Sequence, residues 1–170
     1  MTHVNKDKPR IGITLGDLNG IGPEVVLKAL SDHRILALIT PVIYGSERVL
    51  SYYKKALELE EFNYNPVKNK GQFAAKSVNV VNCWEDQFEV TPGKGSAESG
   101  KFALMAIQQA CADAKESVID ALVTGPIDKH SIHSDAFPFR GHTEFLADYF
   151  GVKTTVMCII GEKLRVALAT

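Results

Sequence analysis

The sequence predicts an α/β fold with a largely parallel sheet, and three observations support this. Short apolar runs alternate with longer segments of helical periodicity, as in βαβ units. Glycine-rich turns follow two of the apolar runs, at residues 16–22 and 125–126. The chain has 170 residues, 45% of them hydrophobic, which is enough for a sizeable buried core.

The first half of the chain alternates strands and helices. Residues 11–15 form an apolar run and predict a buried strand, and residues 23–31 predict a helix with a proline in its first turn. The apolar run 39–44, closed by a glycine, predicts a second strand. Residues 46–59 begin with a serine cap and carry an apolar face, so they predict a helix. The polar, asparagine-rich residues 60–71 predict a loop.

The pattern continues after this loop. Residues 77–82 predict a strand, and residues 96–116 predict a long helix from alanine and apolar residues at helical spacing. The apolar run 118–124 predicts a further strand. Residues 145–150 belong to a helix that follows Thr143.

The chain ends on two more apolar segments, residues 154–160 and 164–170, with a short turn between them at 161–162. This pattern predicts a hairpin and therefore a mixed sheet. In α/β sheets, functional loops follow the carboxyl ends of strands, and this sequence stops at an apolar strand where such a loop would begin. We therefore expect residues 1–170 to be the amino-terminal portion of a larger, apparently truncated fold. We expect no internal domain boundary within these residues.

Composition narrows the function classes. A net charge of −1 gives no electrostatic case for nucleic acid or an anionic membrane as partner. The polar amino terminus is not a secretory signal, and no apolar run approaches membrane-spanning length. The three cysteines are far apart and odd in number, which favours a reducing, cytoplasmic location.

The first site-like segment is Gly-Asp-Leu-Asn-Gly-Ile-Gly-Pro-Glu at residues 16–24. Its glycines allow positive φ and close backbone approach, and Asp17 and Asn19 offer side-chain ligands. The alternative is a turn that only joins a strand to a helix. The density of glycines beside short polar side chains favours a ligand loop.

The second segment follows the strand at 118–124 and runs from Gly125 to His130. Lys129 can meet a phosphate or carboxylate, and Asp128 can fix the loop. For Lys129 a ligand role and a solvated turn are about equally supported. For Asp128 and His130 we favour the ordinary turn.

The third segment is Gly-His-Thr-Glu at residues 141–144. Gly141 permits a sharp turn, after which His142 and Thr143 lead a helix whose free N–H groups attract an anion. The imidazole of His142 can donate to a phosphate or transfer a proton. Thr143 can alternatively serve as the helix N-cap, with Glu144 favourable in the first turn.

A match to the phosphate-binding pattern GxxxxGK at residues 95–101 is interpreted as coincidental. Phe102 stands where Mg²⁺ coordination needs serine or threonine, and no convincing strand precedes the segment. The segment remains the basis of a rival hypothesis, a phosphate- or nucleotide-binding module that depends on Lys101.

Taken together, GDLNGIGPE at 16–24, VTGPIDK at 123–129 and GHTEFLA at 141–147 resemble the 4-hydroxythreonine-4-phosphate dehydrogenase family of vitamin B6 (pyridoxal phosphate) biosynthesis. The resemblance covers nearly the whole chain and implies an isocitrate/isopropylmalate dehydrogenase-like α/β fold with flanking helices. Two departures are Leu18, where the family often has proline, and Asp128, where it more usually has asparagine or histidine.

The resemblance implies a cytoplasmic, homodimeric oxidoreductase that uses NAD (or NADP) and a divalent metal, Zn, Mg, Mn or Co. Such enzymes oxidise and decarboxylate 4-phosphohydroxy-L-threonine to 3-amino-2-oxopropyl phosphate. It assigns substrate binding to His142 and Thr143, and places Asp17, Asn19 and Lys129 in segments that line the same cleft. It places no metal ligand in this chain, since the family's three metal-binding histidines would follow Thr170, and it identifies no proton-transfer residue.

Two further expectations follow. This chain alone should be inactive, because the metal ligands and most cofactor-binding residues of such enzymes would lie downstream. Within the enzyme class, the alternative is a related dehydrogenase for another phosphorylated or dihydroxylated small acid.

Overall fold

The computed structural model describes residues 8–169. They divide into two compact units, one ending at Pro138 and the other beginning at Phe139. Each unit is described by itself.

The first unit is built on a five-stranded sheet with the strand order β3-β4-β2-β1-β5. All four strand pairings are parallel, and Gly12 of β1 lies opposite Val42 of β2 and Leu122 of β5. A parallel order with β1 inside the sheet confirms the α/β class expected from the alternation of elements. The strands are β1 (Arg10–Thr14), β2 (Thr40–Gly45), β3 (Tyr64–Pro66), β4 (Val78–Asn82) and β5 (Ala121–Thr124).

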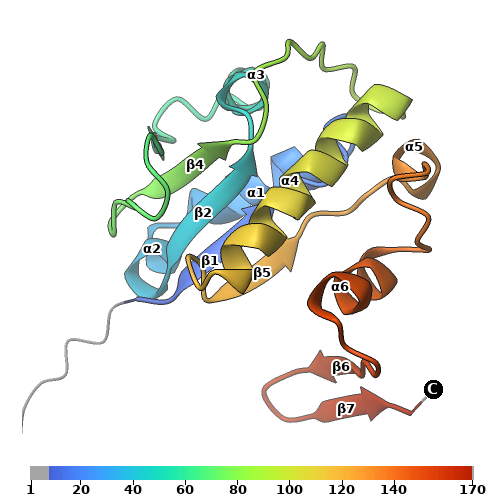
Figure 1. The fold of residues 1–170 in the computed structure, drawn as a ribbon. Helices are drawn as coiled ribbons and strands as arrows, with labels where there is room; N and C mark the ends of the chain where they lie inside the picture. The colour runs from blue at the N-terminus through green and yellow to red at the C-terminus, as the bar shows by residue number, and fades with distance from the viewer. Residues whose placement is uncertain (1–7, 170) are drawn as a thin grey trace, which may run out of the picture. The chain divides into compact units, whose positions relative to one another are not determined.

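Helices cover both faces of this sheet (Figure 1). The long helix α4 crosses one face along β1, β2 and β5, and α1 lies behind the strands, packed against α2 and α3. Serine side chains cap α3 and α4. The cap at Ser46 was predicted, and Ser96 caps the helix that was predicted to begin there. The helices of this unit are α1 (Gly22–Leu30), α2 (His33–Leu38), α3 (Glu47–Ala56), α4 (Ala97–Lys115) and α5 (Lys129–Ile132).

The core between sheet and helices is mainly apolar, and a buried hydrogen bond connects the sheet to α4. Side chains such as Ile43, Leu50 and Phe102 are almost completely buried. The hydroxyl of the equally buried Tyr44 on β2 donates to Oδ2 of Asp113 on α4 over 2.7 Å. Because a buried carboxylate needs hydrogen-bond partners, this pair fixes how α4 lies on the sheet.

Three short elements were not predicted from the sequence. Helix α2 is a six-residue helix capped by Asp32, and none of its side chains is fully buried, although Ile35 and Leu36 pack against the core. Helix α5 has four residues and is capped by Asp128. Strand β3 has three residues at the sheet edge and falls inside the predicted loop 60–71. Its residue Pro66 favours a loop over a strand in a prediction from sequence, because proline is rare within strands.

The second unit contains one helix and one hairpin. Helix α6 (His142–Phe150) ends at Gly151, which has a positive φ of 67°. Strands β6 (Met157–Ile160) and β7 (Arg165–Leu168) pair antiparallel, and the Gly161 N–H donates to the Leu164 carbonyl across the turn over 2.8 Å. The predicted hairpin is therefore confirmed. Its ladder forms a two-stranded sheet of its own, while the five-stranded sheet is parallel throughout its described residues.

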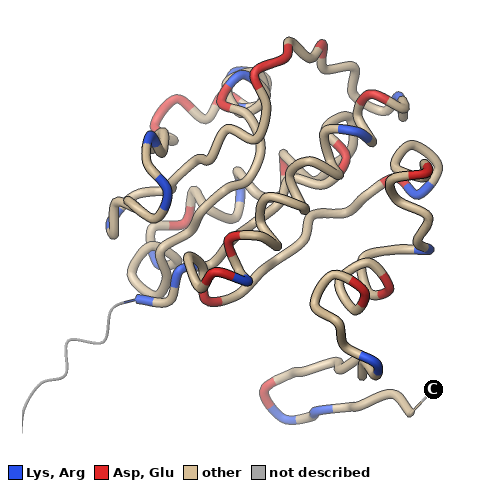
Figure 2. Tube along the Cα trace, viewed as in Figure 1, with Lys and Arg blue, Asp and Glu red and all other residues tan. Residues whose placement is uncertain are grey.

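Charged residues of both signs are interspersed along the tube in Figure 2, in line with the net charge of −1. Among residues 8–169, none of the helices combines the length and the apolar character that crossing a membrane requires.

Candidate functional site

The glycine-rich loop after β1 is shaped by contact with another loop of the same chain. Gly16 has a φ of 72°, and a Cβ at this position would clash with the Pro126 carbonyl oxygen and lie 2.7 Å from the Gly125 carbonyl carbon. A side chain at this position is therefore disfavoured by the positive φ and also by the lack of room for a Cβ. The loop after β5 occupies the volume that a side chain would need.

Two further glycines complete this backbone-to-backbone packing. A Cβ on Gly22 would clash with the Leu15 carbonyl oxygen, and one on Gly125 would lie 2.6 Å from that same oxygen. The Asp17 N–H donates to the Pro126 carbonyl over 2.9 Å and joins the two loops directly. The close approach that the sequence predicted is thus made to the chain itself. Sequence alone could not distinguish this use of glycine from approach to a ligand.

This contact lies at a topological switch point of the sheet. The chain leaves β1 toward α1 on one face, and it leaves β5 toward α5, which packs against α4 on the other. In open α/β sheets, ligands bind outside the carboxyl ends of strands at such points. The first two site-like segments therefore meet at the position in the fold where a ligand site is expected.

Asp17 and Asn19 are both buried, and a hydrogen bond between them shapes the loop after β1. The Asn19 N–H donates to Oδ1 of Asp17 over 3.1 Å, and the Gly20 N–H donates to the Asp17 carbonyl over 3.0 Å. The Asn19 side chain faces a different segment, accepting from the Thr91 N–H over 2.8 Å and donating to the Lys94 carbonyl over 2.8 Å. Asn19 thus connects the loop after β1 to the loop before α4, a link that local sequence did not reveal.

Lys129 begins the short helix α5 at the same edge of the sheet and is exposed. Asp128 before it accepts from the His130 N–H over 3.2 Å and from the Ser131 hydroxyl. These bonds lower the pKa of Asp128, the hydroxyl of Ser131 having the largest effect. Asp128 is a helix cap, as the interpretation of an ordinary turn predicted. A ligand role for Lys129 stays a prediction.

The third segment lies in the second unit and opens α6. Gly141 is the N-cap and supplies no side-chain hydrogen bond, so the alternative that Thr143 caps the helix is wrong. His142 and Thr143 are instead the first two helical residues, where backbone N–H groups have no intrahelical partner. His142 is half-buried, and burial lowers its pKa below 6.5. The neutral imidazole that results at pH 7 has one donor and one acceptor nitrogen.

The structure therefore groups the candidate residues in two sets. Asp17, Asn19 and Lys129 belong to the loops at the carboxyl edge of the sheet in the first unit. His142 and Thr143 belong to the helix start of the second unit. Their role in substrate binding stays a prediction.

The GxxxxGK match at residues 95–101 lies at the start of helix α4. Ser96 accepts from the Ser99 N–H over 3.0 Å in a capping box, and no strand lies between the end of β4 at Asn82 and this cap. Lys101 is exposed, 3.8 Å from Asp86 and 5.5 Å from the centre of the Phe102 ring. A P-loop requires a strand directly before the glycines, so the motif lacks its context here.

Neither a metal site nor a disulfide is found in the part of the chain that the structure describes. Residues 8–169 bring together no group of three His, Cys, Asp or Glu side chains that could hold a metal ion. The cysteines are free, and burial raises the pKa of Cys83 to about 12 and that of Cys111 to about 11. Thiols with raised pKa values are poor nucleophiles and poor metal ligands at neutral pH.

Comparison with known proteins finds one matching family and related phosphate-ester dehydrogenases. The family model of the pyridoxal phosphate biosynthetic protein PdxA matches residues 37–170. A 4-hydroxythreonine-4-phosphate dehydrogenase of Bacteroides thetaiotaomicron is 42% identical over 168 residues, which cover 98% of this chain and 46% of the relative. A D-threonate 4-phosphate dehydrogenase of Cupriavidus necator is 31% identical, over 95% of this chain and 49% of the relative.

Solved structures agree with the sequence matches. A 4-hydroxythreonine-4-phosphate dehydrogenase from Burkholderia phymatum superposes with a TM-score of 0.85 at 28% identity, over 94% of this chain and 49% of that one. The chain thus spans about half the length of the relatives it matches.

Proposed function

This chain belongs to the family of the pyridoxal phosphate biosynthetic protein PdxA, and on that premise we propose that it forms part of a 4-hydroxythreonine-4-phosphate dehydrogenase. The observation that carries the proposal is the 42% identity to a relative of that name, which extends over 98% of this chain. Because the chain spans 46% of that relative, the activity is proposed for the complete protein.

The reaction we propose is the oxidation of 4-phosphohydroxy-L-threonine. The secondary hydroxyl would lose its proton and its carbon a hydride, which NAD would accept when bound, and the substrate would become a β-keto acid. The keto acid then loses CO₂ and leaves 3-amino-2-oxopropyl phosphate. Positioning of the hydroxyl carbon beside the nicotinamide carries much of the rate of such a reaction.

His142 and Thr143 are proposed to anchor the substrate. Both stand in the first turn of α6, where the free N–H groups and the helix dipole favour an anionic group. The lowered pKa of His142 supports a neutral imidazole that donates one hydrogen bond without carrying charge. The segments that bear Asp17 and Lys129 lie at the carboxyl edge of the sheet, and they are proposed to take part in ligand binding in the complete enzyme.

NAD and a divalent metal belong to this proposal only for the complete protein. Residues 8–169 assemble no set of three metal-ligating side chains, and at Gly16 and Gly22 the chain's own backbone occupies the space of a side chain. The family resemblance implies that the groups that hold the metal and most of the cofactor belong to the remainder of the complete protein. A divalent cation would polarise the substrate hydroxyl and stabilise negative charge.

A second candidate substrate has its own support. The 31% identical relative from Cupriavidus necator is a D-threonate 4-phosphate dehydrogenase, and it matches the same region of this chain. D-threonate 4-phosphate is also a phosphorylated hydroxy acid, and we propose it as the second candidate substrate.

The complete protein is proposed to be a cytoplasmic homodimer. The family resemblance supports this assembly, and the free cysteines suit a reducing compartment.

The test is turnover by the complete gene product, followed as NADH absorbance with 4-phosphohydroxy-L-threonine, NAD and a divalent metal, with and without chelator. Chelator-sensitive turnover is the expected result. Faster turnover of D-threonate 4-phosphate would select the second candidate, and no turnover of either acid by a folded dimer would refute the dehydrogenase proposal. The 170-residue chain alone should be inactive in the same assay.

A further inference from the structure

Asn19 is placed as a connector between two loops at the carboxyl edge of the sheet. The residue is 2% exposed, and both ends of its side-chain amide are used. Oδ1 accepts from the Thr91 N–H and Nδ2 donates to the Lys94 carbonyl, each over 2.8 Å, while the Asn19 carbonyl accepts from the Gly93 N–H over 2.7 Å. Three hydrogen bonds from one residue therefore hold residues 91–94.

The held segment is a tight turn. The Lys94 N–H donates to the Thr91 carbonyl over 3.1 Å, and Gly93 takes a φ of 78° with no other atom within 4 Å of the place where a Cβ would lie. The backbone of this turn is thus fixed by Asn19 on one side and open on the other.

The next residue lies close to α5. A Cβ on Gly95 would lie 2.6 Å from Oδ2 of Asp128, the N-cap of α5, and 2.7 Å from Oγ of Ser131 within that helix. The residue before Lys94 is therefore hydrogen-bonded to Asn19, and the residue after it lies against α5. Lys129, the first residue of α5, follows Asp128 directly, so this contact also brings the turn of Lys94 close to the start of α5.

Lys94 itself has an exposed side chain. Within residues 8–169 its ammonium takes part in no hydrogen bond or ion pair, in contrast to Lys28, Lys70 and Lys101, which pair with carboxylates. An unpaired cation on a turn whose backbone Asn19 already holds is suited to an anionic ligand, because the backbone needs no further ordering on binding.

We infer that Asn19 is a positioning residue, which holds the turn at residues 91–95 so that the Lys94 ammonium meets an anionic group of the substrate. This rests on the proposed function and deepens it, since it assigns a phosphate- or carboxylate-binding side chain to a turn that carries no other assignment. Asn19 acts through Lys94, and its own amide touches only the turn.

The test compares Asn19→Ala, Lys94→Gln and the double variant in the complete protein. Each single substitution is expected to raise KM for the phosphorylated substrate about tenfold, as loss of one charge-assisted contact does, and to leave kcat within about twofold. The double variant should be no worse than either single one, because Asn19 works through Lys94. Lys94→Arg keeps the cation and should keep KM near that of the unsubstituted protein.

Trypsin gives a readout that does not depend on catalysis. Asn19→Ala frees the turn, so cleavage after Lys94 should accelerate, whereas the matched control Asn63→Ala, an exposed amide bonded only to the Glu61 carbonyl, should leave both cleavage and KM unchanged. If Asn19→Ala fails to fold, the two exposed Lys94 variants decide the question, since neither disturbs the core.

The inference is overturned if Lys94→Gln leaves KM unchanged, or if the effects of Asn19→Ala and Lys94→Gln add. Calorimetric binding of 4-phosphohydroxy-L-threonine separates this inference from the proposed function. Binding that weakens in both single variants without any turnover refutes the dehydrogenase and supports the role of Lys94. A complete protein that binds no phosphorylated acid overturns both.

Discussion

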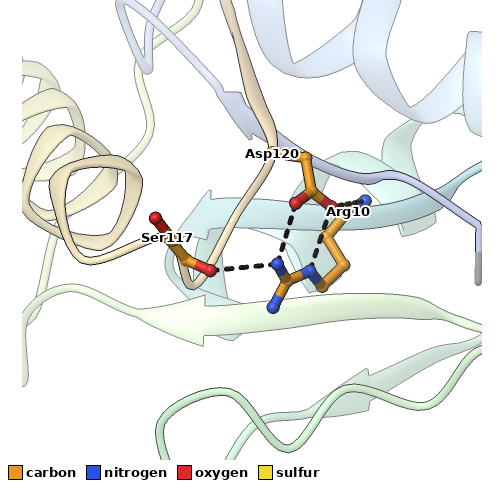
Figure 3. Close-up of polar contacts among 3 residues, drawn as sticks. All are labelled: Arg10, Ser117 and Asp120. Carbon is orange, nitrogen blue, oxygen red and sulfur yellow. Dashed lines mark hydrogen bonds and ion pairs between the residues drawn. The ribbon is translucent and has the colours of Figure 1, made fainter.

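Arg10 and Asp120 clasp the amino ends of the two neighbouring strands β1 and β5 (Figure 3). The Arg10 guanidinium donates from Nη2 to Oδ1 of Asp120 over 2.8 Å and from Nε to Oδ2 over 3.0 Å, and its backbone N–H donates to Oδ2 over 2.7 Å. The same Nη2 reaches the Ser117 carbonyl over 2.9 Å. This clasp joins residues 110 positions apart in the chain.

Asp120→Asn should lower the stability of the folded protein at neutral pH. Its hydrogen bonds to Arg10 lower the pKa of Asp120 to about 2. The carboxylate's contribution is complete above its unfolded pKa of about 3.9 and is lost as the pH falls through about 2. Because both side chains are more than a third exposed, water screens the pair and we expect a loss of only about 1 kcal/mol at pH 7.

The stability loss of Asp120→Asn is measured by thermal unfolding of the complete protein at pH 7 and at lower pH values. The difference in stability between Asp120→Asn and the unsubstituted protein should shrink below about pH 4. Asp135→Asn, an exposed carboxylate of the same unit, is the matched control and should unfold like the unsubstituted protein. A difference that stayed constant down to about pH 2 would contradict the assigned cause.

Gly16→Ala and Gly93→Ala form a pair that separates backbone strain from lack of space. Both glycines have a positive φ, of 72° and 78°, but only Gly16 has the Pro126 carbonyl in the way of a Cβ. Gly93→Ala should cost about 1 kcal/mol of unfolding free energy from strain alone. Gly16→Ala should cost roughly 3 kcal/mol or more, because the loop after β5 must also move.

Urea denaturation of both variants measures these costs. Equal losses for the two glycines would mean that the loops after β1 and β5 are not in the close contact described.

Tyr44→Phe should destabilise the protein by about 1–2 kcal/mol, since it removes a donor from the buried carboxylate of Asp113. Asp113 keeps partners in Lys70 at 3.0 Å and Gln109 at 3.1 Å, so the fold should persist. Tyr64→Phe is the control, because the Tyr64 hydroxyl contacts that of Ser51 at an exposed position. A Tyr44→Phe variant no less stable than Tyr64→Phe would show that the buried bond adds nothing to stability.

The imidazole of His142 should titrate with a midpoint below 6.5 in the folded protein. Burial lowers its pKa by disfavouring the charged form. The neutral ring therefore contributes stability above about pH 6.5, and this contribution is lost as the pH falls through the folded pKa. The ring-proton signal in an NMR titration reports the midpoint, with urea-unfolded protein as the reference, and a folded midpoint at or above the reference would contradict the assignment.

Local sequence predicted the longer elements and their approximate ends. Hydrophobic periodicity located β1, α1, β2, α3, β4 and α4 within a few residues, and Ser46 and Ser96 marked helix starts because a serine oxygen satisfies the free N–H groups of a first turn. Periodicity did not show α2, α5 or β3, since elements of three to six residues bury too few side chains to produce a pattern.

Only the tertiary structure decided what each site-like segment contacts. The sequence contains the glycines at 16 and 22, but the fold brings the backbone at Pro126 and Leu15 against them. Likewise, the residues near Asn19 in the sequence do not predict its hydrogen bond to Thr91, which is 72 residues away. Periodicity and capping act over a few residues, whereas strand order and loop contacts depend on packing between distant segments. The longer elements could therefore be predicted from the chain alone, while the hydrogen bonds between Asn19 and the turn before α4 became visible only in the fold.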